Sequence, residues 1–345
     1  MTGTELALGV AGRWALNGVT SALGPRLSIL TFHRVLREPD PIFPGEVDAL
    51  RFDRFMALVA RSFQVLPLSD AVARLEQRTL PPRALCITFD DGYADNHDVA
   101  LPILKRHGLS ACFFIATGFL DGGRMFNDTV IECVRRSPLS RLDLGEFGLG
   151  VYDLHTPAQR AAVIGRVLPL VKFLTPDERP QALQRLQRLC KPDALPDGLM
   201  MARAQVQALH AVGMEIGAHT VRHPILCSVD DATAEQEIIG SRNALQDLID
   251  HPVTLFAYPN GRPGRDYADR HAAMIKRLGF GAAVSTAHGV AKYGDDRYQL
   301  PRVTPWGRTA GPWMARLVAS RWQASFAMAP REPAAPPLST SSPLR

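Results

Sequence analysis

Short apolar runs rich in β-branched and aromatic residues recur along the chain, at residues 27–32, 84–89, 111–117, 215–218, 253–258, 281–285 and 298–303. Between most of them, apolar positions recur with helical spacing, as in residues 52–63, 95–107 and 234–249. Apolar strands that alternate with amphipathic helices are typical of βα units around a parallel sheet. The pattern therefore predicts an α/β protein with about seven parallel strands.

Two regions interrupt this alternation. Almost a hundred residues separate the third strand from the fourth, and they contain helical patterns at 129–136, 157–174 and 177–189. We expect a helical insertion at about residues 124–203, placed over one end of the sheet. From residue 329 onward the chain is mostly Pro, Ala and Ser and has little to bury, which predicts a disordered tail over 329–345.

The first 26 residues predict a helix that precedes the barrel domain of residues 27–328. Residues 5–24 are apolar, but Glu5 precedes them and no basic segment leads them, which argues against a secretory signal. We expect a cytoplasmic protein whose first helix packs on the domain. An alternative is an amphipathic helix that makes peripheral contact with a membrane through Leu6, Leu8, Trp14 and Leu16.

Composition narrows the classes of partner. Hydrophobic residues make up 46% and charged residues 21% of the 345 positions, which is typical of a globular protein. The net charge of +5 comes from arginines scattered along the chain, with no basic cluster interleaved with aromatic residues, so we expect no nucleic-acid partner. The five cysteines form no CxxC pair and are expected to be reduced thiols in the core.

Two adjacent carboxylates carry the strongest chemical signal. Asp90 and Asp91 follow the apolar strand at 84–89 and precede Gly92. Side chains of neighbouring residues at a strand end point in different directions, so one carboxylate can bind a metal ion while the other remains a base. The same tripeptide also occurs in ordinary solvated turns.

A pair of histidines follows another strand. His219 and His223 come directly after the strand at 215–218, and Pro224 discourages a continuing helix. The four-residue spacing alone arises easily by chance, so the position at a strand end is the better argument. Both imidazoles should lie in one tight loop.

Three further segments place polar groups at strand ends. His33 ends the first strand, Tyr258, Pro259 and Asn260 form a turn after the fifth, and Arg302 interrupts an apolar segment where it needs a carboxylate partner if it is buried. A lone histidine such as His33 is more often structural than catalytic.

All these segments lie at the carboxyl ends of their strands. In a parallel barrel those ends meet at one mouth, which is where such folds place their active sites. Asp91, His219 and His223 would then form a site of two imidazoles and one carboxylate with open coordination positions. Such a site is typical of a catalytic metal centre and not of a closed structural one.

Together these motifs resemble those of the polysaccharide deacetylase (NodB-homology) family, carbohydrate esterase family 4. TFDDG at residues 88–92 and HTxxHP at residues 219–224 are the matching motifs, and the resemblance extends over about residues 27–305. It implies a distorted (β/α) barrel with a helical insertion and a metal-dependent hydrolase that removes N-acetyl groups from an N-acetylhexosamine-containing glycan.

The resemblance also implies roles for individual residues. Asp90 resembles the catalytic base, and Asp91, His219 and His223 resemble the ligands of a divalent metal ion, for which zinc is our first choice. A backbone N–H of the turn at Tyr258, Pro259 and Asn260 would hold the oxyanion.

The chain departs from the family pattern at several positions. Ala257 stands where many members have Arg, and Asn260 stands where many have an aromatic residue. No apolar-x-His-Asp element occurs near the C-terminus, and His288, which precedes a glycine, is expected in a loop. A subset of the family has an N-terminal strand ending in Tyr-His, which ILTFHRV resembles. We therefore assign the catalytic acid to His33 and expect Arg302 to replace the missing Arg.

Three alternatives remain open at this point. Non-haem iron oxygenases also use two His and one carboxylate, although usually on all-β scaffolds. A glycan-binding descendant without activity would explain the departures, and a metal amidase could act on another N-acyl or cyclic amide. The insertion carries none of the motif residues, so we expect it to shape substrate choice and not the chemistry.

Overall fold

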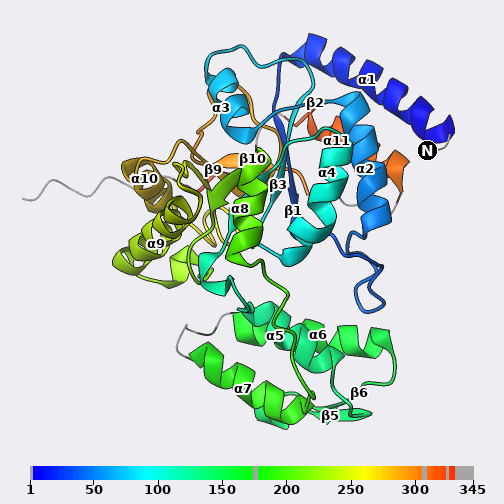
Figure 1. Cartoon of the computed structure of the whole chain (residues 1–345), viewed down its shortest axis with the longest axis vertical. Coiled ribbons are helices and arrows are strands. Elements are labelled where there is room, and N and C mark those ends of the chain that lie inside the picture. Colours follow the sequence, from blue (N-terminus) through cyan, green and yellow to red (C-terminus); the bar gives the residue numbers. More distant parts are fainter. Residues whose placement is uncertain (1–2, 173, 175–177, 305–308, 324–325, 331–345) are drawn as a thin grey trace, which may run out of the picture.

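The computed structural model describes residues 3–172, 174, 178–304, 309–323 and 326–330. Seven parallel strands follow one another around a nearly closed barrel, in the order β1-β3-β4-β7-β8-β9-β10 (Figure 1). The seven strands are β1 (Ser28–Phe32), β3 (Ala84–Phe89), β4 (Cys112–Ile115), β7 (Glu215–Ala218), β8 (Leu255–Ala257), β9 (Ala282–His288) and β10 (Leu300–Arg302). The expected distorted (β/α) barrel is confirmed.

The ring closes between its first and last members. Thr31 N–H donates to the carbonyl of Val303, and Val303 N–H donates to the carbonyl of Ile29, at 3.2 and 2.8 Å. This closure brings the carboxyl ends of β1 and β10 together, although about 270 residues separate them in the chain. A short strand, β2 (Gln64–Val65), adds to the edge of β3.

Helices cover the outside of the barrel (Figure 1). They are α2 (Ala49–Ser62), α3 (Leu68–Glu76), a π-helical turn (Asn96–Ala100) that continues into α4 (Leu101–Arg106), α8 (Arg203–Ala211), α9 (Asp231–Ile249), α10 (Asp269–Arg277) and α11 (Ala310–Ser320). Asp48 and Asp230 cap α2 and α9, because each carboxylate accepts a hydrogen bond from the backbone N–H three residues later. The helices predicted at 52–63 and 234–249 are present, and they begin slightly earlier than predicted, at Ala49 and Asp231.

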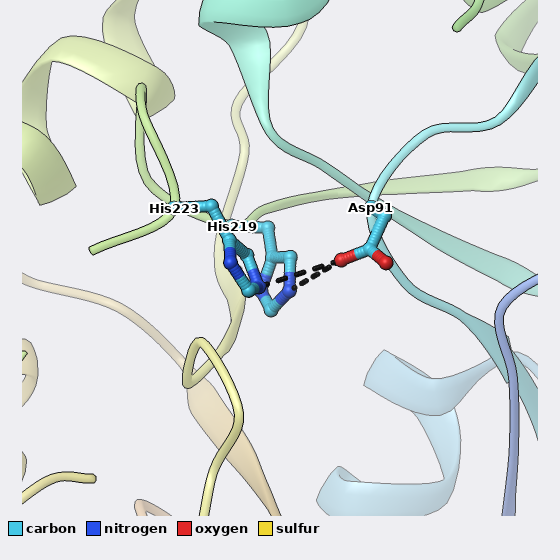
Figure 2. A group of neighbouring side chains, drawn as sticks. All are labelled: Asp91, His219 and His223. Carbon is cyan, nitrogen blue, oxygen red and sulfur yellow. Dashed lines mark ion pairs between the residues drawn. The ribbon is translucent and has the colours of Figure 1, made fainter. Parts of the chain in front are cut away.

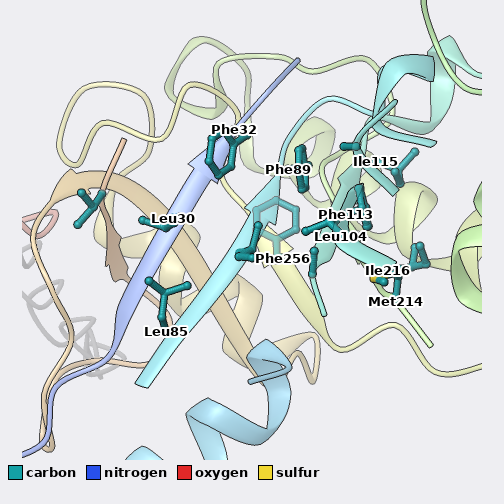
Figure 3. Close-up of a cluster of buried hydrophobic side chains, with 14 of the residues drawn as sticks. Leu30, Phe32, Leu85, Phe89, Leu104, Phe113, Ile115, Met214, Ile216 and Phe256 are labelled. Atoms are coloured by element: carbon teal, nitrogen blue, oxygen red, sulfur yellow. The ribbon is translucent and has the colours of Figure 1, made fainter. Parts of the chain in front are cut away.

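Strand residues alternate between two apolar clusters. Leu85, Ile87 and Phe89 belong to the large cluster under the outer helices, part of which is drawn in Figure 3. Ala84 and Cys86 belong to a second cluster with residues of β8, β9 and β10, across the barrel interior. Both faces of a barrel strand are buried, which explains the continuous apolar runs in the sequence. The same alternation turns the side chains of Thr88 and Asp90 inward.

The segment between β4 and β7 forms a separate layer at one end of the barrel (Figure 1). It contains α5 (Phe126–Arg135), a two-stranded antiparallel sheet of β5 (Arg141–Asp143) and β6 (Val151–Asp153), α6 (Pro157–Lys172) and α7 (Glu178–Cys190). These elements share a buried cluster of their own, centred on Val134, Ile164 and Leu186. The three expected helices are present, and the small sheet is an addition.

The N-terminal helix α1 (Gly3–Leu23) packs against α2 and α11. Leu16 is fully buried there, so the expectation that Leu16 contacts a membrane is wrong, whereas Trp14 is 76% exposed. The side chains of Leu6 and Leu8 lie outside the described residues. Within the part of the chain that the structure describes, no helix is both long and apolar enough to cross a membrane.

Two further expectations need correction. Ala329 is buried, and its N–H donates to Gln299 at 2.8 Å, so the start of the expected tail packs on the barrel; residues 331–345 lie outside the described residues. None of the five cysteines is in a disulfide, but Cys227 is exposed and is not a core thiol.

Candidate active site

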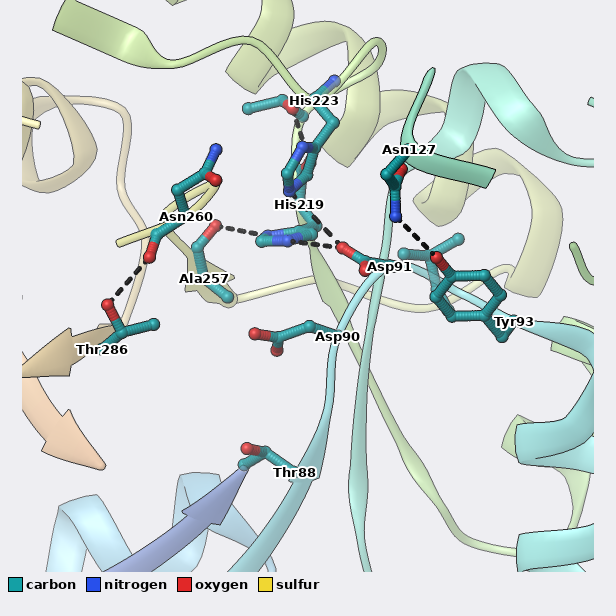
Figure 4. Close-up of polar contacts among 12 residues, drawn as sticks. Thr88, Asp90, Asp91, Tyr93, Asn127, His219, His223, Ala257, Asn260 and Thr286 are labelled. Carbon is teal, nitrogen blue, oxygen red and sulfur yellow. Dashed lines mark hydrogen bonds and ion pairs between the residues drawn. The ribbon is translucent and has the colours of Figure 1, made fainter. Parts of the chain in front are cut away.

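The loop after β3 separates two adjacent carboxylates. Asp91 and Gly92 both have positive φ, +76° and +93°, so the chain turns sharply after Asp90. A side chain at Gly92 would meet Ile115 at 3.2 Å, and therefore both conformation and space favour glycine there. The turn directs Asp91 toward the loop after β7, while Asp90 points into the barrel (Figure 4).

Asp91, His219 and His223 converge on one point (Figure 2). Oδ1 of Asp91 lies 3.3 Å from Nε2 of His219 and 3.4 Å from Nε2 of His223. One ligand atom from each residue lies within 4.8 Å of the others, which fits a single ion between them. The structure therefore brings together the three residues that the sequence assigned to a metal.

The surroundings of the two imidazoles also fit a metal ion. Nδ1 of His219 lies 2.8 Å from the carbonyl of Ala257, so a proton on Nδ1 leaves the lone pair of Nε2 facing Asp91. Burial lowers the pKa of His223 to about 4 despite the nearby Asp91 carboxylate, so this imidazole is neutral and able to ligate at physiological pH. Two imidazole nitrogens and one carboxylate oxygen are a donor set that zinc and similar divalent ions accept.

A buried glutamate holds the histidine loop in place. Glu237 on α9 accepts hydrogen bonds from the backbone N–H groups of Val221 and Arg222, at 3.0 and 2.7 Å. Thr220 and His223 both have positive φ, +65° and +54°, a conformation that costs free energy in non-glycine residues. The loop is therefore fixed by its contacts in a conformation that directs both imidazoles to Asp91.

Asp90 pairs with Arg302 inside the barrel. Nη1 and Nη2 of Arg302 each lie 2.7 Å from one carboxylate oxygen of Asp90, and Nε donates to the carbonyl of Ser285. Both side chains are almost completely buried. Burial favours the neutral acid, but the Arg302 charge and its hydrogen bonds outweigh this effect and lower the pKa of Asp90. The carboxylate partner that the sequence required for Arg302 is thus Asp90.

His33 follows β1 and faces the same cavity. Its carbonyl accepts a hydrogen bond from Asn96 at 2.9 Å, and the adjacent Arg34 pairs with Asp95 at 2.8 Å. The loop after β1 is thereby tied to the segment that follows Asp90 and Asp91. His288, by contrast, is the last residue of β9 and not a loop residue, and it lines a different cavity with Val303 and Trp313.

The turn after β8 leaves one free backbone donor. Tyr258 N–H donates to the carbonyl of Val284 at 3.2 Å, and Pro259 has no N–H. Asn260, with φ of +58°, lies beside the histidines, and its N–H makes no hydrogen bond to any described residue (Figure 4). The Tyr258 side chain is buried away from the cavity, where its hydroxyl donates to the carbonyl of Tyr298. Of these three residues, Asn260 alone can offer a donor to a substrate.

These groups line one cavity of about 510 Å³ at the mouth of the barrel. The barrel contributes His33, Asp90, Asp91, His219, His223, Asn260, Arg265 and Thr286, and the insertion contributes Met125, Phe126, Asn127, Leu168, Pro169 and Lys172. The second group could not be predicted from the sequence, because the pattern of α6 does not show which of its faces meets the barrel.

The sequence profile of the polysaccharide deacetylase family matches residues 77–139 and 176–283. These segments include both aspartates of the site and both histidines. The chain belongs to the polysaccharide deacetylase family. This membership confirms the expected class of enzyme, a hydrolase of amide bonds, and with the parallel barrel it argues against an iron oxygenase on an all-β scaffold.

Individual members of this family are similar to this chain at low sequence identity. A protein named for the same family, YxkH of Bacillus subtilis strain 168, is 21% identical over 284 residues, which are 81% of this chain and 71% of YxkH. The Streptococcus pyogenes deacetylase PplD, solved in complex with acetate, is 18% identical with a TM-score of 0.59 and covers 85% of this chain and 97% of its own. IcaB from Ammonifex degensii is 17% identical with a TM-score of 0.52, and the match covers 86% of this chain and 97% of IcaB. At these identities the solved structures establish the fold shared within the deacetylase family.

Proposed function

We propose that this polysaccharide deacetylase is a metal-dependent hydrolase that removes the N-acetyl group from an N-acetylhexosamine-containing glycan. The observation that carries the proposal is the convergence of Asp91, His219 and His223 in the cavity that Asp90 and His33 also line. A divalent ion held by the three ligands would polarise the acetamide carbonyl and lower the pKa of a water molecule to near 7. Zinc is the ion that we expect from the donor set.

Asp90 would act as the general base. Arg302 keeps its carboxylate ionised and fixes its orientation through two hydrogen bonds. Each carboxylate oxygen has two lone-pair directions, so one remains on each oxygen to accept a proton from the attacking water.

Asn260 and His33 would serve the later steps. The N–H of Asn260 can donate to the oxygen that becomes negative when water adds to the carbonyl. An amine leaves readily only after protonation, and His33, which also lines the cavity, would supply that proton. The products would be acetate and a free amino sugar.

The direct test is acetate release from N-acetylglucosamine oligomers and lipid-linked N-acetylated sugars, with and without a chelator. We expect release that the chelator abolishes and added zinc restores. Activity on another N-acyl or cyclic amide but on none of these sugars would favour the metal amidase instead, and release that persists with the chelator would contradict metal dependence.

Two variants separate the roles of the adjacent aspartates. Asp91→Asn should lose both bound metal and activity, whereas Asp90→Asn should retain stoichiometric metal by elemental analysis and lose activity by about 10²- to 10⁴-fold, as expected for a general base. Near-normal turnover by Asp90→Asn would show that the roles are assigned wrongly.

A further inference from the structure

One corner of the cavity, lined by the insertion and by the loop after β8, carries positive charge that the proposed chemistry does not use. Lys172, in the last turn of α6, and Arg265, in the loop after β8, both line the cavity. Lys172 lies within electrostatic reach of Arg262, Arg265 and one carboxylate, Asp266. Among the described residues, Lys172 therefore shares this corner with two other cations and one anion.

The carboxylates around the cavity do not neutralise Lys172. Asp90 is neutralised by Arg302. Asp91 belongs to the candidate metal site, where a divalent ion would more than offset its charge. Asp266 is buried, and one of its carboxylate oxygens accepts a hydrogen bond from the backbone N–H of Arg262 at 3.0 Å. None of these three carboxylates forms an ion pair with Lys172.

Among the described residues, Lys172 has no partner that would account for its position. Its side chain makes no hydrogen bond or ion pair with the described residues. Cations near a helix C-terminus often bind the last carbonyls, but here Arg179 does so, since its guanidinium donates to the carbonyls of Val171, Lys172 and Leu174 at 3.1 to 3.4 Å. Pro169, one turn earlier on α6, and Leu168 line the cavity on the same face as Lys172.

We propose that Lys172 binds an anionic substituent, a phosphate or a carboxylate, carried by the sugar whose acetamide enters the site. The inference rests on the proposed function and adds a substrate class to it. A half-buried ammonium without a partner forms a charge-assisted hydrogen bond with such a group once the substrate excludes water from the cavity. A neutral sugar would leave the ammonium desolvated without compensation, so the cavity discriminates against it.

Binding of sugars that lack an acetamide tests this inference without any turnover. Glucose 1-phosphate and glucuronate are the anionic probes, and methyl glucoside is the neutral one. Calorimetry should show that at least one anionic probe binds about tenfold more tightly than methyl glucoside, and that the difference shrinks as the salt concentration rises. The tighter of the two anionic probes identifies the substituent as phosphate or carboxylate.

Lys172→Gln should remove about tenfold of the affinity for the anionic probe, whereas Lys276→Gln, which removes an exposed lysine on α10, should leave it unchanged. In acetate-release assays the ratio of kcat/KM for N-acetylglucosamine 1-phosphate to that for its methyl glycoside should fall by a similar factor in Lys172→Gln. Equal affinity for all three probes would overturn the inference. So would an equal loss of affinity for the anionic probe in Lys172→Gln and Lys276→Gln. Absence of acetate release from every sugar would instead overturn the proposed function, because the binding measurement does not depend on it.

Discussion

Asp90 and Asp91 are adjacent in the chain, yet their carboxylates have different partners. Asp91 faces two imidazoles, and Asp90 faces a guanidinium. The sequence suggested this division because neighbouring side chains diverge at a strand end. It also indicated that Arg302 needs a carboxylate, but which one follows only from the closure of the barrel. Lys172 was unpredictable, since its position depends on how the insertion packs on the barrel.

Arg302→Met should destabilise the protein by about 3–5 kcal/mol, the usual cost of leaving one member of a buried ion pair alone. The reason is that Asp90 would remain charged and buried without its two hydrogen bonds. Chemical denaturation should also show that the double variant Asp90→Asn/Arg302→Met loses less free energy of unfolding than the two single variants lose together. Additive losses would mean that the pair contributes no coupling.

Asp128 on α5 should make stability depend on pH. Burial is the main reason that the pKa of Asp128 rises from 3.8 to about 7, and one of its carboxylate oxygens has no partner among the described residues. Between pH of about 4 and 7 the folded protein therefore retains a proton that the unfolded chain has released. The free energy of unfolding should fall as the pH rises through this window, by at most about 4 kcal/mol.

Asp128→Asn should remove this slope, because asparagine does not titrate and can still accept the hydrogen bond from Tyr93. Urea denaturation of the metal-free protein at several pH values measures it. Asp247→Asn, an exposed position on α9, is the control and should keep the wild-type slope. A slope that survives in Asp128→Asn would assign it to other groups.

At the scale of elements, the apolar runs predicted all seven barrel strands, and two of them, β3 and β7, with the observed limits. The long segments whose apolar positions recur with helical spacing were predicted as helices equally well. The two-residue strand β2 and the three-residue strands β5 and β6 were missed, because elements so short carry no periodicity. His288 was misplaced because β9 continues to the residue directly before a glycine.

Closure of β1 against β10 bears on the catalytic acid. It places His33 in the cavity with Asp90, whereas His288 at the end of β9 lies in another one. His33→Ala should therefore lower kcat by about 10²- to 10⁴-fold with metal retained and remove the basic limb of the pH profile. His288→Ala should keep near-normal turnover. The reverse pattern would give the acid role to His288.

At the scale of the whole molecule, the barrel and the insertion have separate apolar clusters, and both line the active-site cavity. The barrel clusters and the insertion cluster share no buried residue. They are joined by contacts such as the ion pair between Arg135 on α5 and Asp40 in the loop before α2. The metal ligands lie on the barrel side and Lys172 lies on the insertion side, so the two cores should affect different steps.

Ile164→Ala, which opens a cavity in the insertion core, should therefore weaken that core without disturbing the metal ligands. Removing a fully buried isoleucine costs about 2–5 kcal/mol, and native-state hydrogen exchange should place the loss in α5, α6 and α7 while β3, β4 and β7 keep their protection. Bound metal should stay stoichiometric and KM should rise, because the insertion forms one wall of the cavity. Ile238→Ala, at an equally buried position on α9, is the matched control and should lower protection in the barrel strands. If Ile164→Ala lowers protection equally in both layers, the insertion and the barrel unfold as one unit, and the insertion cannot be altered separately from the metal site.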